Sequence, residues 1–128
     1  MSQSLAKIYV HAIFSTKNRV PCLSPDVSAE LHPYAATVLK NMECPPIQIG
    51  GVADHIHILC ALSKNLSAAK FIEEIKKPLS KWLKTKAAAL KGFHWQSGYG
   101  VFSVSQSKVQ DVRRYIQRQA AHHGRQAF

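Results

Sequence analysis

Acidic residues are few in this chain. Seven Asp and Glu stand against 17 Lys and Arg among 128 residues, so the formal net charge is +10 at pH 7. A charge of this size on so small a protein favours a polyanionic partner, and nucleic acid is the first candidate. The shortage also argues against a nuclease built on a cluster of carboxylates, because only Glu73, Glu74 and Asp111 follow Asp54.

The sequence also lacks paired cysteine motifs and long hydrophobic runs. Cys22, Cys44 and Cys60 are widely spaced, form no Cys-x-x-Cys pair for zinc and are odd in number, so we expect a protein of the reducing cytoplasm. No stretch of 18 apolar residues occurs, and the N-terminus lacks the basic segment and apolar run of an export signal. We therefore expect no membrane partner and one soluble domain spanning residues 1–128, with 46% hydrophobic residues available for its core.

Two histidines stand out in the segment at residues 53–60, Ala-Asp-His-Ile-His-Ile-Leu-Cys. Polar and apolar residues alternate there as in a β-strand, so His55 and His57 project from one face and Ile56 and Ile58 from the other. Alternate strand positions lie about 7 Å apart at the backbone, and imidazoles at that spacing can converge on one divalent ion. The pair alone leaves a second interpretation open, in which both histidines are simply hydrogen-bonded on a half-buried strand.

Turn and capping signals divide the rest of the chain into strands and helices. Ser24 with Pro25 marks a helix start, Ser107 opens another helix through a capping box, and Pro78 should kink or break the helix that follows Ser67. The expected elements are a strand at 7–15, a helix from 24 to about 42, a strand at 47–52 with a glycine bend or bulge, the histidine strand, a helix from 67 to about 90, short strands at 92–96 and 98–104, and a helix from 107 onward.

One more histidine, His11, lies inside the first expected strand. A single histidine in a strand is usually a satisfied core residue, and this is the role we expect for it. A place near the paired histidines is the alternative.

Basic side chains gather at three places where nucleic acid could bind. These are the loop at residues 16–19, one ridge of the helix that follows Ser67, and the final helix. Each has a plainer interpretation in which the charges only keep an exposed face solvated. The expected DNA contacts are Lys17, Arg19, Lys70, Lys77, Lys81, Arg114 and Arg118.

Three patterns together carry a resemblance to a known family. They are His-x-His on a strand, the run Gly-Tyr-Gly-x-Phe-Ser-Val-Ser at residues 98–105 before a helix, and Tyr115 with Gln119 on that helix. This combination resembles the single-tyrosine (HUH, IS200-like) transposases that move small insertion sequences as single-stranded DNA, including relatives associated with repetitive extragenic palindromes. The likeness spans nearly the whole chain, with the segments at 14–19 and 50–55 included.

The resemblance implies a fold, a chemistry and an assembly. The fold would be α+β and ferredoxin-like, a mainly antiparallel sheet flanked by helices, with the tyrosine on a C-terminal helix. His55, His57 and Gln119 would bind Mg²⁺ or Mn²⁺, and Tyr115 would be the nucleophile that forms a 5′-phosphotyrosine. The family's partners are single-stranded DNA with hairpin ends and a second copy of the chain, whose tyrosine can act in trans. No residue identifies a general base, and Asp111, one turn before Tyr115, is open to that role or to simple solvation.

Other classes of protein that use paired histidines fit this sequence less well. Histidine-triad nucleotide hydrolases need a third alternating histidine, and position 59 is Leu59. Two-histidine phosphodiesterases need two separated His-x-Ser or His-x-Thr motifs, and this chain offers none around His11 or His55. The serious alternative is a non-catalytic or domesticated nucleic-acid-binding regulator derived from a transposase. Such a protein would not need the two histidines, Tyr115 and Gln119 together, so their joint presence favours the enzyme.

Overall fold

The computed structural model describes residues 5–119 of the chain. Its order of strands and long helices is β-α-β-β-α-β, followed by a last helix. The elements are β1 (Tyr9–Ser15), η1 (Lys17–Arg19), α1 (Pro25–Asn41), β2 (Pro46–Val52), β3 (His55–Ala61), α2 (Ala68–Leu83), η2 (Ala88–Leu90), β4 (Gly100–Val104), η3 (Gln106–Lys108) and α3 (Val109–Gln117), where η denotes a single 3₁₀ turn.

The four strands form one antiparallel sheet in the order β2-β3-β1-β4. With its two crossing helices this is the expected ferredoxin-like α+β fold, which is therefore confirmed. β3 and β1 are the central pair, and their register sets Ile13 opposite His57 and Ser15 opposite His55. The histidine strand is thus held by a neighbour on each side.

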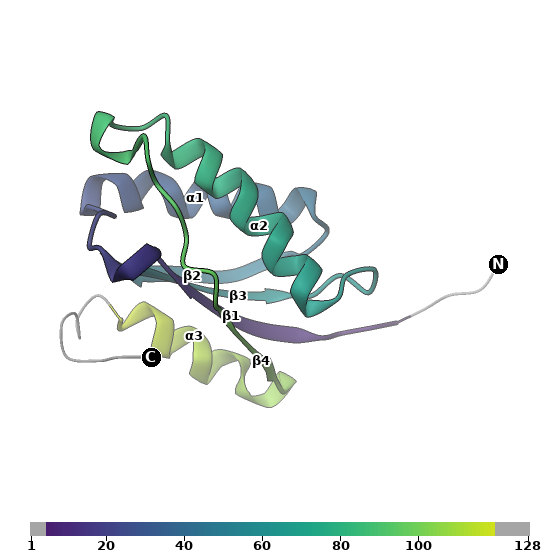
Figure 1. Cartoon of the computed structure of the whole chain (residues 1–128). Helices are drawn as coiled ribbons and strands as arrows, with labels where there is room; N and C mark the ends of the chain where they lie inside the picture. The colour runs from purple at the N-terminus through teal and green to yellow at the C-terminus, as the bar shows by residue number, and fades with distance from the viewer. Residues whose placement is uncertain (1–4, 120–128) are drawn as a thin grey trace.

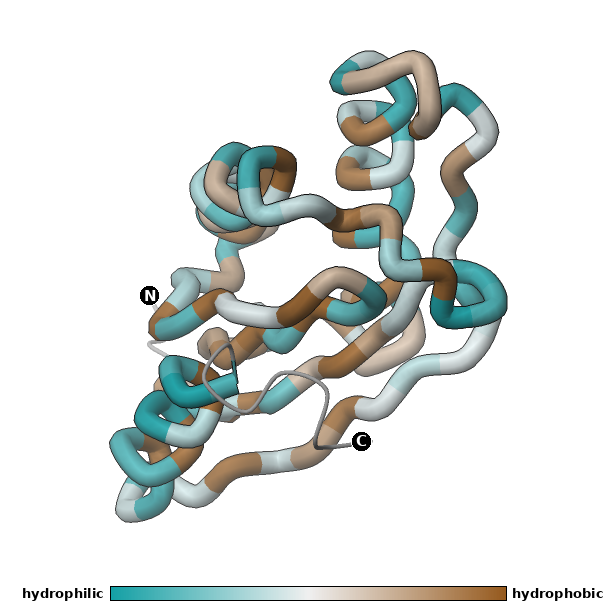
Figure 2. Tube along the Cα trace, turned by 90° about the vertical axis from the view of Figure 1, so that its left-hand side faces the viewer, coloured by the Kyte–Doolittle hydropathy of each residue, from teal (hydrophilic) through white to brown (hydrophobic). Residues whose placement is uncertain are grey.

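Helices cover both faces of the sheet. In Figure 1, α1 and α2 lie on one face and α3 lies on the other. Successive strand residues alternate between the faces, so Phe14 and Ile58 belong to the large core beneath α1 and α2, whereas Leu59 packs with Val109 and Ile116 of α3. Figure 2 shows hydrophobic segments interleaved with hydrophilic ones along both the helices and the extended segments. The odd-numbered face of β3, which carries the histidines, is the face that α3 covers.

The long helices begin where the sequence predicts. The side chains of Ser24 and Ser67 accept hydrogen bonds from the N–H groups of Val27 and Lys70 at the first turns of α1 and α2. α2 ends at Leu83, short of the expected end near residue 90, and the turn at 88–90 is separate. The helix is also not broken at Pro78, because buried side chains in the turns around it outweigh one missing hydrogen bond.

Three local expectations were wrong. Residues 92–96 form no strand and contribute a single bridge between Trp95 and Thr16. The irregularity in β2 falls at its start, between Pro46 and Gln48, and not at the glycines. Ser107 does not cap α3, since its hydroxyl lies beside that of Ser105 and the helix begins two residues later without a side-chain cap. Each of these depends on tertiary contacts that local propensity does not encode.

No helix within residues 5–119 combines the length and the apolar character that crossing a membrane requires.

α3 lies close to the sheet because the residue of β2 that faces it, Gly50, has no side chain. A Cβ atom at Gly50 would lie 2.7 Å from Cγ2 and 3.1 Å from the carbonyl oxygen of Ile116. The Gln48 side chain accepts hydrogen bonds from Arg113 and Gln117, at 3.2 Å each, and fixes the helix along β2. This contact decides where Tyr115, the neighbour of Ile116, is placed.

Gly50→Ala should therefore push α3 away from the sheet. We expect a loss of about 1–3 kcal/mol in the free energy of unfolding, because the added methyl group meets both backbone and side chain. Urea unfolding measures this, with Gly92→Ala as the matched control, since a Cβ at Gly92 meets nothing within 4 Å. Equal stability of the two variants would contradict the close approach of α3.

Candidate functional site

The paired histidines of β3 lie side by side beneath α3. Their ring centroids are 5.0 Å apart with the ring planes at 71°. The exposed fraction is 4% for His55 and 0% for His57, so bulk water does not solvate either imidazole. The strand alternation expected from the sequence therefore holds, and it places both rings in the layer between the sheet and the last helix.

Tyr115 of α3 closes this layer from the other side. Its ring centroid lies 5.9 Å from that of His57, in an edge-to-face arrangement. The residue nevertheless remains 40% exposed, whereas its neighbour Ile116 is buried against the sheet. The phenol is thus held next to the histidines and is still open to a large substrate.

Gln119 follows one helical turn after Tyr115, just beyond the end of α3. It is 5% exposed, and its side chain makes a hydrogen-bonding contact with His57. The structure therefore brings together all four residues that the sequence singles out: His55, His57, Tyr115 and Gln119. Their chemical roles stay predictions.

His11 also belongs to the site, contrary to the core role that the sequence favours. Its Nε2 atom lies 2.9 Å from Nδ1 of His57, and the two rings stack with centroids 5.1 Å apart. Its ring also meets Tyr115 edge-on at 6.2 Å. The sequence holds one signal for this, the odd-numbered position of His11 in β1, but the signal is informative only once the pairing of β1 with β3 is known.

Asp54 is another residue of the site, and the sequence assigned it no role. Its Oδ1 accepts a hydrogen bond from Nδ1 of His55 at 2.7 Å, and its Oδ2 accepts one from Nε of Arg19 at 3.2 Å. Burial opposes ionisation of this carboxyl, but the hydrogen bonds from His55 and Arg19 prevail and hold the pKa of Asp54 below its ordinary value. Asp54 is therefore a carboxylate that accepts hydrogen bonds from both neighbours.

The loop at residues 16–19 is shaped to bring Arg19 to this carboxylate. Asn18 and Arg19 both have left-handed backbone angles, with φ of 58° and 56°. The N–H of Thr16 donates to the carbonyl oxygen of Asp54 at 2.9 Å, which ties the loop to the turn before β3. Two successive left-handed residues without glycine are uncommon, and here they fold the loop back over the turn.

The site favours neutral imidazoles. Burial, followed by the nearby His11 and His55, lowers the pKa of His57 from 6.5 to about 3, and the contact with Gln119 only partly opposes this. Burial also lowers the pKa of His11. A neutral imidazole is the form that binds a metal ion, so His57 is suited to that role at neutral pH.

The donor set fits a divalent ion only if Gln119 takes part. Within residues 5–119, no three His, Cys, Asp or Glu side chains group as metal ligands. His55 and His57 therefore supply two nitrogens, and a third protein ligand would be the amide oxygen of Gln119. Nε2 of His57 is buried and makes no hydrogen bond of good geometry with the described residues, as expected of an atom reserved for another ligand.

The predicted DNA-contact residues lie on two sides of the molecule. Lys17 and Arg19 belong to the loop beside Asp54, and Arg114 and Arg118 flank Tyr115. Lys70, Lys77 and Lys81 lie on α2, across the sheet from the histidines (Figure 1).

Several of these charges already have partners. Lys70 and Lys77 are paired with Glu73, and Arg114 is paired with Asp111 at 2.7 Å. Asp111 is thus engaged on the exposed surface of α3, which agrees with solvation rather than with a general base. Contact of any of the basic residues with DNA stays a prediction.

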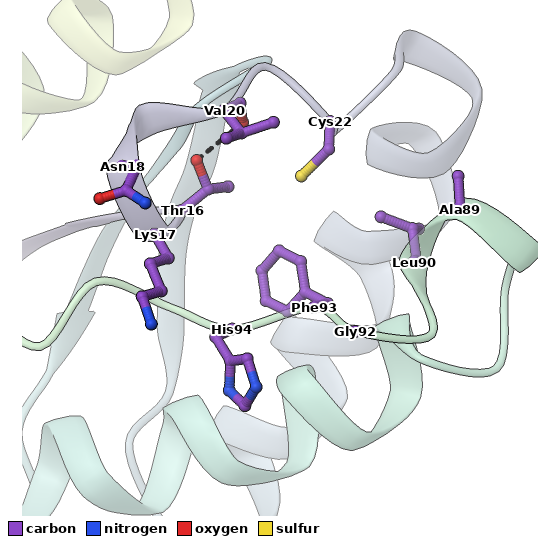
Figure 3. A pocket seen from close by; sticks show the side chains of 10 residues that line it. All are labelled: Thr16, Lys17, Asn18, Val20, Cys22, Ala89, Leu90, Gly92, Phe93 and His94. Atoms are coloured by element: carbon purple, nitrogen blue, oxygen red, sulfur yellow. Dashed lines mark hydrogen bonds between the residues drawn. The ribbon is translucent and has the colours of Figure 1, made fainter.

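A separate cavity of about 310 Å³ opens between the 16–19 loop and the segment around residue 90. Figure 3 shows the sulfur of Cys22, the ring of Phe93 and the side chain of Leu90 directed into it. Neither the paired histidines nor Tyr115 lines this cavity, so it is distinct from the histidine site.

Comparison with known proteins identifies the class. Buried paired histidines beneath a tyrosine helix, on a ferredoxin-like sheet, are the features that the sequence resemblance implies for a single-tyrosine transposase. The family described as "Transposase IS200 like" matches residues 4–119. The chain belongs to this family, and it is accordingly a transposase, a class of enzymes that cleave and recombine DNA.

Two solved structures share the fold. A candidate transposase from Deinococcus radiodurans R1 has a TM-score of 0.71 and 20% identity, over 93% of this chain and 98% of its own. A REP-associated tyrosine transposase bound to a REP hairpin has a TM-score of 0.67 and 17% identity, over 97% of this chain and 75% of its own. No curated protein matches the sequence.

The lowered pKa of His57 predicts how stability changes with pH. Below about pH 6.5 the unfolded chain takes up a proton at this histidine, and the folded chain does so only near pH 3. The free energy of unfolding of the metal-free protein should therefore fall as pH drops through this window. Urea unfolding at several pH values measures the decline, which should be shallower in His57→Gln.

The exposed His94 provides the control for this measurement. His94→Gln should keep the decline of the parent protein, because this side chain is solvated in both the folded and the unfolded state. Identical pH profiles for the parent and His57→Gln would show that His57 is not held neutral by the fold.

Proposed function

We propose that this transposase cleaves and rejoins single-stranded DNA by transesterification through Tyr115. The observation that carries the proposal is the placement of an accessible phenol 5.9 Å, ring to ring, from the buried His57. A nucleophile beside buried imidazole nitrogens is an arrangement that suits phosphoryl transfer with metal assistance.

The proposed step exchanges one phosphodiester bond for another. Oη of Tyr115 attacks phosphorus and loses its proton, and the bond from phosphorus to the 3′ oxygen breaks. The products are a 5′-phosphotyrosine and a 3′-hydroxyl, which gains a proton. Attack by a 3′-hydroxyl on the phosphotyrosine reverses the step and joins strands without ATP.

His55, His57 and Gln119 would hold the divalent ion, Mg²⁺ or Mn²⁺. When bound, such an ion polarises the scissile phosphate and orients it for attack. The chain's own contribution is to bury the two imidazoles, keep His57 neutral and hold Tyr115 above them through the packing of Ile116 on Gly50.

The proposed substrate is single-stranded DNA with a hairpin end. The net charge of +10 suits a phosphate backbone, and one solved relative of the same fold is bound to a REP hairpin. In this proposal Arg114 and Arg118 beside Tyr115, together with Lys17 and Arg19 of the 16–19 loop, would hold the strand that is cut. Lys70, Lys77 and Lys81 across the sheet would contact a more distant part of the DNA.

We also propose a cytoplasmic homodimer whose tyrosine acts in trans. Cys22, Cys44 and Cys60 are all free thiols, in keeping with a reducing compartment. In the single chain described here, Tyr115 lies against its own histidines. A composite site would therefore require α3 to move to a second copy, and the polar junction at residues 105–107 is the segment that would permit it.

Removing the hydroxyl of Tyr115 should abolish the chemistry and leave binding intact. In Tyr115→Phe we expect no strand cleavage and no covalent adduct, while hairpin binding stays within about twofold, because the ring keeps its packing on His57. Labelled oligonucleotides from the chain's own genomic flanks measure both. Tyr99→Phe is the matched control, since Tyr99 has a similar exposure of 47% but lies away from the histidines.

Cleavage at an undiminished rate by Tyr115→Phe would rule out the proposed mechanism. Hairpin binding without cleavage by the unmodified protein, with any divalent ion, would favour a domesticated DNA-binding regulator instead.

Cleavage should also depend on a divalent ion held by the histidines. We expect activity to vanish in excess chelator, return with Mg²⁺ or Mn²⁺, and be lost in His57→Ala, because each change removes part of the ligand set. The exposed His94→Ala should retain full activity. Full cleavage in excess chelator would contradict the proposed role of His55, His57 and Gln119.

The trans arrangement predicts that two inactive variants can complement each other. Tyr115→Phe mixed with His57→Ala, under conditions that exchange subunits, gives dimers in which one site combines intact histidines with an intact tyrosine. Cleavage should then return to a measurable fraction of the parent rate. No recovery, with mixed dimers shown to have formed, would mean that Tyr115 acts in cis and would leave the chemistry standing.

A further inference from the structure

Each histidine of the pair is held at Nδ1 by a residue outside the proposed ligand set. Nδ1 of His55 donates to the carboxylate of Asp54 at 2.7 Å. Nδ1 of His57 lies 2.9 Å from Nε2 of His11. Both contacts are made by Nδ1, so both histidines can turn Nε2 toward a common ligand.

We propose that Asp54 and His11 are positioning residues that keep His55 and His57 in the tautomer with the proton on Nδ1, so that both Nε2 atoms present lone pairs to one cation. This inference rests on the proposed function, because that function supplies the cation. It adds two residues that the ligand set itself does not contain.

For His55 the direction of the hydrogen bond follows from its partner. An ionised carboxylate can only accept, so Nδ1 of His55 must carry the proton. Arg19 donates to the other oxygen of Asp54 at 3.2 Å and keeps that carboxylate charged and oriented. Arg19, Asp54 and His55 thus form a relay of the kind that fixes the tautomer of metal-binding histidines in other proteins.

For His57 the partner is another imidazole, which can donate or accept. If Nδ1 of His57 donates, His11 accepts at Nε2 and carries its own proton on Nδ1. The opposite direction would place the proton on the buried Nε2 of His57 and leave no lone pair there for a cation. The first direction keeps that lone pair available, so it is the direction that binding a cation requires.

The stacking of His11 on His57 adds an orientational constraint. The two rings lie at 24° to each other with centroids 5.1 Å apart, and His11 also meets the edge of Tyr115. His11 therefore orients the plane of the His57 ring, in addition to fixing the proton on Nδ1 of His57. A substitution that keeps an aromatic ring at position 11 separates the two effects.

The test reads the tautomers directly in the full-length, metal-free protein. Long-range proton–nitrogen correlation spectra of the labelled imidazoles, recorded at mildly alkaline pH, should show the proton on Nδ1 of both His55 and His57. Asp54→Asn, whose amide can donate as well as accept, should change the spectrum of His55. His11→Phe, which keeps the ring and removes the acceptor, should change that of His57.

A second readout is the binding of Mn²⁺ alone, measured by titration without DNA. Both variants should bind Mn²⁺ about 10- to 100-fold more weakly than the parent, as is usual when an outer partner of a metal-binding histidine is lost. His94→Phe, at an exposed position, should change neither the spectra nor the affinity.

A proton on Nε2 of either histidine in the unmodified protein overturns the inference. So does unchanged Mn²⁺ affinity in both Asp54→Asn and His11→Phe. Because neither readout uses DNA, the inference can stand even if no phosphotyrosine forms, and it can fail while cleavage is observed. Thermal unfolding of each variant shows whether the fold is retained.

Discussion

Two imidazoles buried between a sheet and a helix impose the main constraint on this molecule. A buried ring nitrogen without water calls for a partner, and the four ring nitrogens of His55 and His57 belong to side chains that are 4% and 0% exposed. Groups from three different segments contact these two histidines: Asp54 from the turn before β3, His11 from β1 and Gln119 from the turn just after α3. The site is therefore assembled by the sheet and by the last helix together.

The position of the last helix is the second requirement, because Tyr115 lies on it and Gln119 lies in the turn that follows it. α3 has few buried residues of its own, and its place depends on Val109 and Ile116 packing near Leu59 and on the missing side chain at Gly50. One face of the helix is thus buried in order to orient the other. This explains how Tyr115 can be exposed to a substrate and still be held beside the histidines.

Much of this could be predicted from the sequence. Alternation placed both histidines on one face of β3, serine caps located the starts of α1 and α2, and the resemblance identified the family and the fold. What could not be predicted depends on contacts between distant segments. His11 joins His57 only through the pairing of β1 with β3, and Asp54 meets Arg19 only because the 16–19 loop folds back with left-handed backbone angles. The prediction that Ser107 caps α3 was wrong for the same reason, because local propensity does not include contacts between distant segments.

The central claim is that Tyr115 becomes covalently joined to DNA. The most direct measurement is mass spectrometry of tryptic peptides after reaction with a labelled single-stranded hairpin and a divalent ion. The chain has four tyrosines, and cleavage after Arg114 and Arg118 isolates Tyr115 in a peptide of its own. The account predicts a nucleotide adduct, attached through a 5′ phosphate, on that peptide alone. Strand cleavage without any adduct, or an adduct on Tyr9, Tyr34 or Tyr99, would contradict it.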